Sequence, residues 1–365
     1  MLPTNIENLH NLENANRIIG SDDPILITGA NGFIGLRVVE NLMDRGFREL
    51  TCMTRHSSDS AKLEALVSRR RSGARIRVVK GNLLSREDCA KVTNGVAAIF
   101  HLAAGGSDKS FPDAFMSTVV STRNLLEASV QDKSLKRFVN VSSFAVYTNT
   151  QKRHWRLLDE TCPVETRPEL RGDAYCFAKV KQDEIVVEYA KRFGIPYVIV
   201  RPGYVFGPGK INITGRVGID TFGVFMHLGG SNPVPFTYVD NCAEAIVLAG
   251  LKKGVDGHVF NIVDDDLPSS RQFLGLYKKN VRRFKSIYVP HALSHLLCCI
   301  WERYSNWSEG QLPPVFNRRR WHAHWKKTRY SNEKLKTQVG WTPKVPMAEG
   351  LKRYFEGCRD GRQHA

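Results

Sequence analysis

Residues 25–35 read Ile25-Leu26-Ile27-Thr28-Gly29-Ala30-Asn31-Gly32-Phe33-Ile34-Gly35, an apolar run followed by a turn with glycine at every third position. An amphipathic helix is expected to follow the turn and to stop before Gly46. Such a turn lets a pyrophosphate approach the backbone closely, and the helix N-terminus offers it unpaired N–H groups. The glycine spacing is a weak pattern by itself, but its position between a strand and a helix is the required context. We therefore predict that a dinucleotide binds here, at Gly29, Asn31, Gly32, Phe33, Ile34 and Gly35.

The same alternation of short β-branched runs and longer amphipathic segments continues along the first 200 residues. Further apolar runs occur at 50–54, 76–79, 98–102, 138–141 and 197–200. This order predicts an α/β fold with a doubly wound, Rossmann-type parallel sheet and a smaller C-terminal substrate-binding lobe. We expect a flexible leader over 1–21 and a mainly dinucleotide-binding domain over 22–205. Residues 206–365 should form mainly the substrate-binding lobe, with some segments returning to the Rossmann sheet.

Two residues that follow predicted strands bear on the choice of cofactor. Arg55 stands where enzymes that prefer the unphosphorylated cofactor usually carry an acid, so it would pair with a 2′-phosphate. This favours NADP over NAD, although an ordinary surface arginine fits the position too. Asn82 is suited to hydrogen-bonding an adenine edge, or to serving as a turn residue.

Tyr175 and Lys179 stand four residues apart on a predicted helix, which places them on one face. A tyrosine titrates near pH ~10, and a neighbouring ammonium together with a cationic nicotinamide could lower that pKa enough for acid/base chemistry at neutral pH. A Tyr-x-x-x-Lys pair is common on amphipathic helices, so the pair becomes informative only beside the glycine turn.

Composition sets the broad class of the protein. The chain has 365 residues, of which 42% are hydrophobic and 24% charged, and its eight cysteines show neither Cys-x-x-Cys spacing nor histidine partners at metal-ligand intervals. We expect reduced thiols and no metal. The polar N-terminus lacks the apolar core of a secretory signal, which favours a cytoplasmic protein.

The formal net charge is +17, with basic clusters at 69–71, 278–285 and 318–329. No recognition helix or aromatic-and-basic pattern supports nucleic-acid binding. Between the last two clusters, residues 288–304 carry an apolar series at helical spacing: Leu293, Leu296, Leu297, Ile300 and Trp301. This segment could contact a membrane surface peripherally, or it could be core of the protein's own small lobe.

From Ile25 to about Gly357 the chain resembles the extended short-chain dehydrogenase/reductase superfamily. The matching stretches are Thr28 to Gly35, His101-Leu102-Ala103-Ala104, Thr122 to Ala128, Val141-Ser142-Ser143-Phe144-Ala145-Val146-Tyr147, Tyr175 to Lys179, Arg201 to Gly209 and Phe236 to Asn241. The resemblance implies that Tyr175 is the catalytic acid/base, that Lys179 lowers its pKa and holds the nicotinamide ribose, and that Ser143 hydrogen-bonds the reacting oxygen. It also assigns cofactor contacts to Leu83, Leu102, Ala103, Ala104 and Pro202, besides Tyr175 and Lys179.

The sequence departs from the family pattern at several positions. Asn82 replaces a usual aspartate, Thr118 a common asparagine and Thr148 a usual glycine. The stretch from 149 to 173 is longer than in many relatives and could shape the substrate entrance.

The resemblance also indicates a branch of the family. Phe144 and Ala145 stand where nucleotide-sugar dehydratases carry an Asp-Glu pair, which disfavours dehydration. Arg55 and the C-terminal half resemble the 3β-hydroxysteroid dehydrogenase and dihydroflavonol reductase branch. We therefore expect an NAD(P)-dependent oxidoreductase that acts on a secondary alcohol or ketone of an apolar or amphiphilic small molecule, and, on resemblance alone, a homodimer. A nucleotide-sugar 4-epimerase with tightly bound NAD and a non-catalytic NADP-binding scaffold remain as alternatives.

Overall fold

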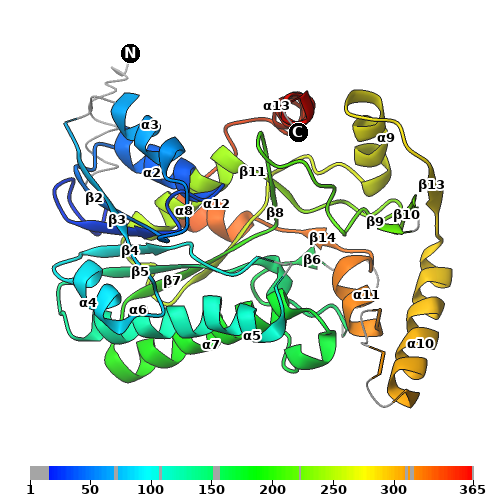
Figure 1. The fold of residues 1–365 in the computed structure, drawn as a ribbon, viewed down its shortest axis with the longest axis horizontal. Coiled ribbons are helices and arrows are strands. Elements are labelled where there is room, and N and C mark those ends of the chain that lie inside the picture. Colours follow the sequence, from blue (N-terminus) through cyan, green and yellow to red (C-terminus); the bar gives the residue numbers. More distant parts are fainter. Residues whose placement is uncertain are drawn as a thin grey trace.

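A seven-stranded parallel sheet forms the centre of the protein, seen in a computed structural model that describes residues 16–69, 73–106, 109–150, 157–221, 223–308, 311–312 and 316–363 (Figure 1). The strand order is β12-β7-β5-β4-β1-β2-β3. The strands are β1 (Ile25–Thr28), β2 (Glu49–Thr54), β3 (Arg75–Lys80), β4 (Ala98–His101), β5 (Arg137–Val141), β7 (Tyr197–Pro202) and β12 (Val259–Ile262).

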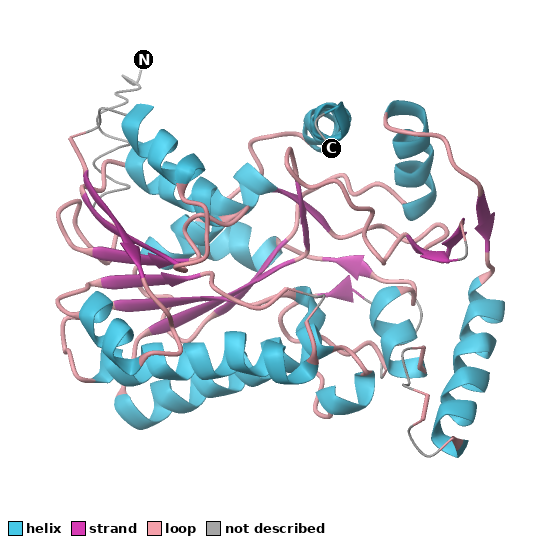
Figure 2. Ribbon diagram, in the orientation of Figure 1, coloured by secondary structure: helices cyan, strands magenta, loops and turns pink. Residues whose placement is uncertain are grey.

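Helices cover both faces of this sheet (Figures 1 and 2). One face carries α2 (Gly35–Asp44), α3 (Ala61–Arg69) and α8 (Val239–Leu251), and the other carries α4 (Arg86–Thr93), α6 (Ser121–Val130) and α7 (Ala174–Phe193). Because both faces are covered, β1, β4 and β5 are buried along their whole length, which is why they read as continuous apolar runs. The strand order reverses between β1 and β4, and ligands of open α/β sheets bind at the carboxyl ends of the strands at such a point.

Most of the remaining elements lie beyond the carboxyl ends of the large sheet (Figure 1), whereas α12 (Glu333–Val339) packs against β12 and α8. Small sheets pair β8 (Tyr204–Phe206) with β11 (Phe236–Tyr238), β6 (Leu157–Leu158) with β14 (Arg329–Tyr330), and β10 (Val224–His227) with both β9 (Gly218–Thr221) and β13 (Ser286–Tyr288). The helices here are α9 (Ser270–Asn280), α10 (His291–Trp307), α11 (Arg318–His324) and α13 (Met347–Gln363). Among the described helices, none is long and apolar enough to cross a membrane.

The structure confirms the expected α/β Rossmann-type fold, and the six predicted strands of the large sheet are present to within one or two residues. The seventh strand, β12, comes from the C-terminal half and pairs with β7. Residues 1–15 of the expected flexible leader and residues 70–71 of the first basic cluster lie outside the described residues. Residues 16–21 contact the folded domain: Ile19 is buried, and the Ile18 amide donates to the Leu251 carbonyl at the end of α8.

Candidate active site

The glycine turn between β1 and α2 is held by contacts that leave no room for side chains. Gly29 has a φ of +68°, and a Cβ there would lie 3.0 Å from the backbone nitrogen of Ala103. A Cβ on Gly35 would overlap the Gly29 carbonyl oxygen. The Gly32 amide donates to the same carbonyl at 3.0 Å, which closes the turn. The N-terminus of α2 therefore sits directly against the carboxyl ends of β1 and β4, as an anion site requires.

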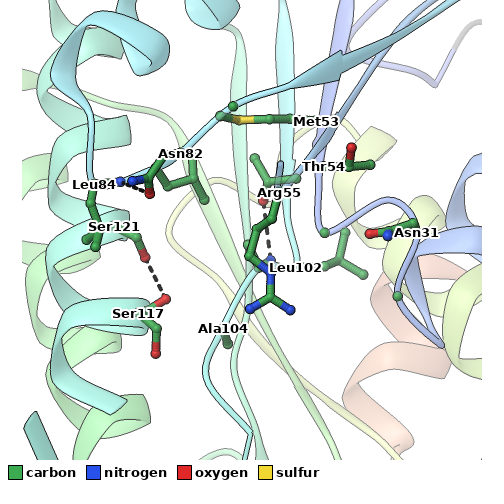
Figure 3. Close-up of a pocket in the computed structure, with 16 residues that line it drawn as sticks. Asn31, Met53, Thr54, Arg55, Asn82, Leu84, Leu102, Ala104, Ser117 and Ser121 are labelled. Carbon is green, nitrogen blue, oxygen red and sulfur yellow. Dashed lines mark hydrogen bonds between the residues drawn. The ribbon is translucent and has the colours of Figure 1, made fainter. Parts of the chain in front are cut away.

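A pocket of about 380 Å³ opens beside this turn (Figure 3). Nine of the fifteen predicted cofactor residues line it: Gly29, Asn31, Gly32, Arg55, Asn82, Leu83, Leu102, Ala103 and Ala104. Figure 3 shows the Arg55 side chain extending into the pocket, with Ser117 and Ser121 on one side of it and Asn31 of the glycine turn on the other. None of the residues that line the pocket is acidic.

The other six predicted cofactor residues lie outside this pocket's lining. Phe33 follows the turn and packs under the ammonium of Lys210 at 5.3 Å, while Ile34 and Gly35 begin α2. Pro202 ends β7, and Tyr175 and Lys179 lie on α7. Sequence reasoning missed the polar lining residues Thr54, at the end of β2, and Ser117 and Ser121, on helices, because no local pattern marks such a side chain as facing a pocket.

Asn82 occupies a turn as well as the pocket wall. Its side-chain oxygen accepts from the Leu84 amide at 3.0 Å, and its backbone amide donates to Asp88 at 2.8 Å. The structure thus shows Asn82 as a turn residue, and its contact with an adenine edge stays a prediction. Thr118, the residue in place of the family's asparagine, accepts at its hydroxyl from the Gly105 amide at 2.9 Å and so anchors the loop after β4.

The three predicted catalytic residues come from two elements that meet at the carboxyl end of β5. Ser143 caps the short helix η2 (Phe144–Val146), and Tyr175 lies in the first turn of α7, whose N-cap is Asp173. Burial raises the pKa of Tyr175, a hydrogen bond with Ser143 lowers it, and the balance is a raised pKa. The predicted lowering of this pKa by Lys179 is therefore not produced by the protein's own groups, which leaves the cationic nicotinamide as the other expected source.

Lys179 is buried, and its ammonium nitrogen lies 6.0 Å from the centre of the Tyr175 ring. Burial lowers the pKa of Lys179 to about 8, although the nearby Asp183 carboxylate acts in the opposite direction. The ammonium donates to the Val141 carbonyl at 2.7 Å and to Oε1 of Gln182 at 2.9 Å. These two hydrogen bonds hold the Lys179 ammonium in place near the Tyr175 ring. They also offset the cost of burying the charged group, because a buried cation needs acceptors for its donors.

A chain of buried hydrogen bonds extends from Lys179 through Gln182 to the end of β1. The Gln182 amide donates to the Thr122 hydroxyl at 2.9 Å, and Thr122 in turn donates to the Thr118 carbonyl. His101 Nε2 therefore donates to Thr122 at 2.8 Å, and its Nδ1 accepts from Thr28 at 2.8 Å. Burial lowers the pKa of His101 to about 3, with a further lowering by the Lys179 charge, so the ring is neutral.

Asp183 holds a second buried network one turn after Lys179. Its carboxylate accepts from Asn140, from Ser142 and, at 3.0 Å, from Arg201 Nη2. Arg201 also lies 4.9 Å from the centre of the Tyr147 ring. Sequence reasoning did not single out Gln182 or Asp183, although both lie on the lysine's face of α7 at a spacing of three and four residues.

The positions where dehydratases carry an acid pair hold apolar side chains with structural contacts. Phe144 is buried and stacks on Tyr330, with ring centres 5.7 Å apart. The Ala145 carbonyl accepts from Arg171 at 2.6 Å. Among the described residues, no group of three or more histidine, cysteine or acidic side chains could hold a metal ion.

Comparison with known proteins places this fold and site in a class. The model of the NAD dependent epimerase/dehydratase family matches residues 25–263, and the chain belongs to this family. The fold and the site are thus those of the short-chain dehydrogenase/reductase class, to which this family belongs.

The curated relatives that match this chain are enzymes with different activities. A trifunctional UDP-glucose 4,6-dehydratase/3,5-epimerase/reductase of Arabidopsis thaliana is 28% identical over 65% of this chain and 36% of its own length. The chain thus spans about a third of the length of the trifunctional relatives. A 3β-hydroxysteroid-dehydrogenase/decarboxylase of the same plant is 24% identical over 91% of this chain and 78% of its own.

Solved structures with the same fold include the UDP-glucuronic acid 4-epimerase of Bacillus cereus in complex with NAD. That enzyme has a TM-score of 0.68 and 20% identity, over 92% of this chain and 99% of its own. The UDP-glucose 4-epimerase of Thermotoga maritima has a TM-score of 0.67 and 21% identity over 93% and 99% of the two chains. At these identities the likeness concerns the fold.

Proposed function

We propose that the protein transfers a hydride between a nicotinamide cofactor and a secondary alcohol or ketone of an apolar or amphiphilic small molecule. The observation that carries this proposal is the convergence of Ser143, Tyr175 and a buried, charged Lys179 beside the dinucleotide pocket, with no carboxylate at Phe144 or Ala145. Such a site can move a proton at one oxygen but has no adjacent acid pair to eliminate water.

The chain's own groups account for the acid/base half of the reaction. The bound nicotinamide supplies or accepts the hydride. In the direction of reduction, Tyr175 gives its phenolic proton to the substrate oxygen, and Ser143 donates a hydrogen bond to the same oxygen, so the developing negative charge meets two donors. Lys179, held by Val141 and Gln182, stabilises the phenolate that remains on Tyr175. In the direction of oxidation each of these steps reverses.

Arg55 supports NADP as the cofactor. It lies at the rim of a pocket whose lining has no acid to accept from a ribose 2′-hydroxyl, and its guanidinium suits a 2′-phosphate. The glycine turn would hold the pyrophosphate, and residues 22–205 would carry most of the cofactor contacts.

Two observations support an apolar substrate. The steroid dehydrogenase relative matches 91% of this chain, and so extends into the C-terminal lobe, whereas the trifunctional relatives match 65%. That lobe contains an apolar groove of about 390 Å³ with Met226, Leu228, Trp301 and Trp325 in its wall. The groove is connected to the catalytic helix: Trp325 in its wall follows His324, whose ring lies 3.9 Å from the carboxylate of Asp173, the N-cap of the helix that carries Tyr175.

A homodimer through the faces of α6 and α7 is part of the same proposal.

The alternative reaction is a nucleotide-sugar 4-epimerisation with a permanently held NAD. It is supported by the trifunctional relatives and by the fold shared with the two UDP-sugar epimerases. The same three residues would serve that reaction, because it also begins by oxidising a secondary alcohol.

The test identifies the nucleotide bound to the purified protein, compares its affinities for NADPH and NADH, and measures which substrates it converts. Nucleotide released on denaturation is identified by chromatography with mass detection, and the empty protein is titrated with NADPH and NADH. We expect sub-stoichiometric nucleotide, tighter binding of NADPH, and oxidation of apolar alcohols. Near-stoichiometric NAD, with interconversion of UDP-sugars, would overturn the proposal in favour of the epimerase.

A Tyr175→Phe variant tests the role of the phenol. Turnover should fall at least about a hundredfold, because the proton donor is lost, while cofactor affinity is retained. Tyr189→Phe is the matched control on the same helix, since its hydroxyl bonds Glu127 at the surface. Equal activity of the two variants would remove Tyr175 from the mechanism.

A further inference from the structure

Helix α10 presents its large apolar side chains outward instead of toward the protein. Leu293, Leu296, Leu297, Ile300, Tyr304 and Trp307 follow one another at positions i, i+3, i+4, i+7, i+11 and i+14, which form one stripe of a helix. All six are exposed, with Leu296 and Ile300 each 55% and Trp307 76% accessible. Of the two readings left open by the sequence, core packing is therefore wrong for Leu296 and Leu297.

The buried face of α10 is made of small and polar residues. Ser294, Cys298 and Ser305 are at most 5% exposed, and Ser294 accepts from the indole nitrogen of Trp321 at 2.9 Å. Small residues on this side let the helix approach α11 closely, while the apolar stripe on its other side stays exposed. The helix stands at the edge of the molecule, away from the large sheet (Figures 1 and 2). Ile287 and Tyr288, in the preceding strand β13, are exposed too and extend the apolar surface.

Basic side chains accompany this surface. From residue 278 to residue 303 the chain has six lysines and arginines and a single acid, Glu302, whose carboxylate is paired with Arg318 at 2.8 Å. Arg282, Arg283 and Lys285 are exposed immediately before β13, and Arg303 is exposed at the edge of the stripe.

Apolar side chains surrounded by uncompensated positive charge match an anionic lipid surface, where aliphatic groups enter the acyl region and cations remain among the headgroups. Tyr288, Tyr304 and Trp307 are the residue types enriched at that boundary.

The apolar groove in the C-terminal lobe opens on the same surface. Leu297, Ile300 and Tyr304 belong both to the stripe and to the groove wall, and Ile219 and Met226 of the adjacent small sheet form the other side. The apolar surface is thus continuous from the outside of α10 into the protein. A second copy of the chain fits this surface less well, because the net positive charge of both copies would be brought together.

We infer that α10 and β13 form a membrane-docking surface, on which the apolar stripe enters one leaflet of an anionic bilayer and the basic residues of 278–303 contact its headgroups. This surface is separate from the dinucleotide pocket and does not depend on which reaction the protein catalyses.

Flotation with lipid vesicles tests the inference on the full chain. Wild-type protein should float with vesicles of phosphatidylcholine containing about one third phosphatidylserine, and less with pure phosphatidylcholine. The Leu293→Ser/Leu296→Ser/Ile300→Ser variant should lose at least about tenfold in partitioning. Leu170→Ser/Phe193→Ser is the matched control, because it removes comparably exposed apolar side chains from η3 (Pro168–Arg171) and α7. Unchanged thermal unfolding and NADPH binding verify that the variants are folded.

The charge contribution is tested by Arg283→Glu/Lys285→Glu, which should weaken binding to the anionic vesicles only. Trp307 offers a direct reading, because brominated lipids should quench its fluorescence and the Trp307→Phe variant should lose that quenching. A wild type that stays with the soluble fraction overturns the inference, as does equal flotation of the three-serine variant. Sedimentation showing that the stripe instead joins two copies, with the three-serine variant monomeric, also overturns it.

Discussion

The ammonium nitrogen of Lys179 donates to Oε1 of Gln182 at 2.9 Å, and the amide nitrogen of the same glutamine donates to Thr122 at 2.9 Å. Thr122 accepts this bond because its own proton is given to the Thr118 carbonyl. The orientation of the amide is thereby determined from both ends, and an acceptor faces the lysine.

Gln182→Leu should lower turnover at least about tenfold, because Lys179 would lose one of its two buried acceptors and its pKa, already lowered to about 8 by burial, would fall further. The high-pH limb of the turnover profile should move to lower pH. Gln182→Glu retains an acceptor and adds a negative charge, so the limb should move to higher pH. Equal losses in both variants at every pH would indicate a purely structural role.

Arg55→Ala should weaken NADPH binding by at least about tenfold, since one charge-assisted contact to the 2′-phosphate is lost. NADH binding should change little. Isothermal titration with both cofactors measures this, with Arg192→Ala as a control that removes the same charge from the exposed end of α7. If both cofactors weaken equally, Arg55 does not read the phosphate.

Arg201→Met should reduce the free energy of unfolding by ~3–5 kcal/mol, because the buried carboxylate of Asp183 would keep only the bonds from Asn140 and Ser142. The matched control is Lys181→Ala on the same helix, whose partner Glu184 is half exposed, and we expect it to cost at most ~1 kcal/mol. Urea denaturation distinguishes the two. A similar small change in both would mean that the buried pair contributes no more than a surface pair.

Asp264→Asn should make the protein more stable at alkaline pH. Burial raises the pKa of Asp264 to about 7. Because the folded-state pKa lies above the unfolded-state value, this carboxyl contributes stability below about pH 4 that is lost as the pH rises through about 7. The amide can accept the same bonds from the Tyr238 amide and from Asn241.

Melting curves between about pH 4 and pH 8 test this expectation. At pH 8 the Asp264→Asn variant should exceed the wild type by ~2–4 kcal/mol, and the two should converge in acid. Asp220→Asn, at an exposed position of β9, is the control and should leave the pH dependence unchanged. Parallel curves for wild type and Asp264→Asn would contradict the assignment.

The sequence alone determined the dinucleotide half of this protein. The glycine turn, the strands before and after it, and the Tyr175–Lys179 pair depend on neighbours a few residues away, so their periodicity and turn chemistry can be read along the chain. The same locality explains why Arg55 and Asn82, which follow β2 and β3, could be expected beside the glycine turn, where both line one pocket.

The tertiary structure decided what depends on residues far apart in the chain. The pairing of β12 with β7, the bond from Gln182 to Thr122 and the ion pair of Asp183 with Arg201 join segments that no local pattern connects. Helix α10 illustrates the limit most clearly. Its periodicity predicted a helix with one apolar stripe, but periodicity does not determine whether that stripe faces the protein core or the solvent. Only the packing of Ser294 and Cys298 against α11 turned that stripe outward, because the small residues allow the close approach that the leucines would prevent.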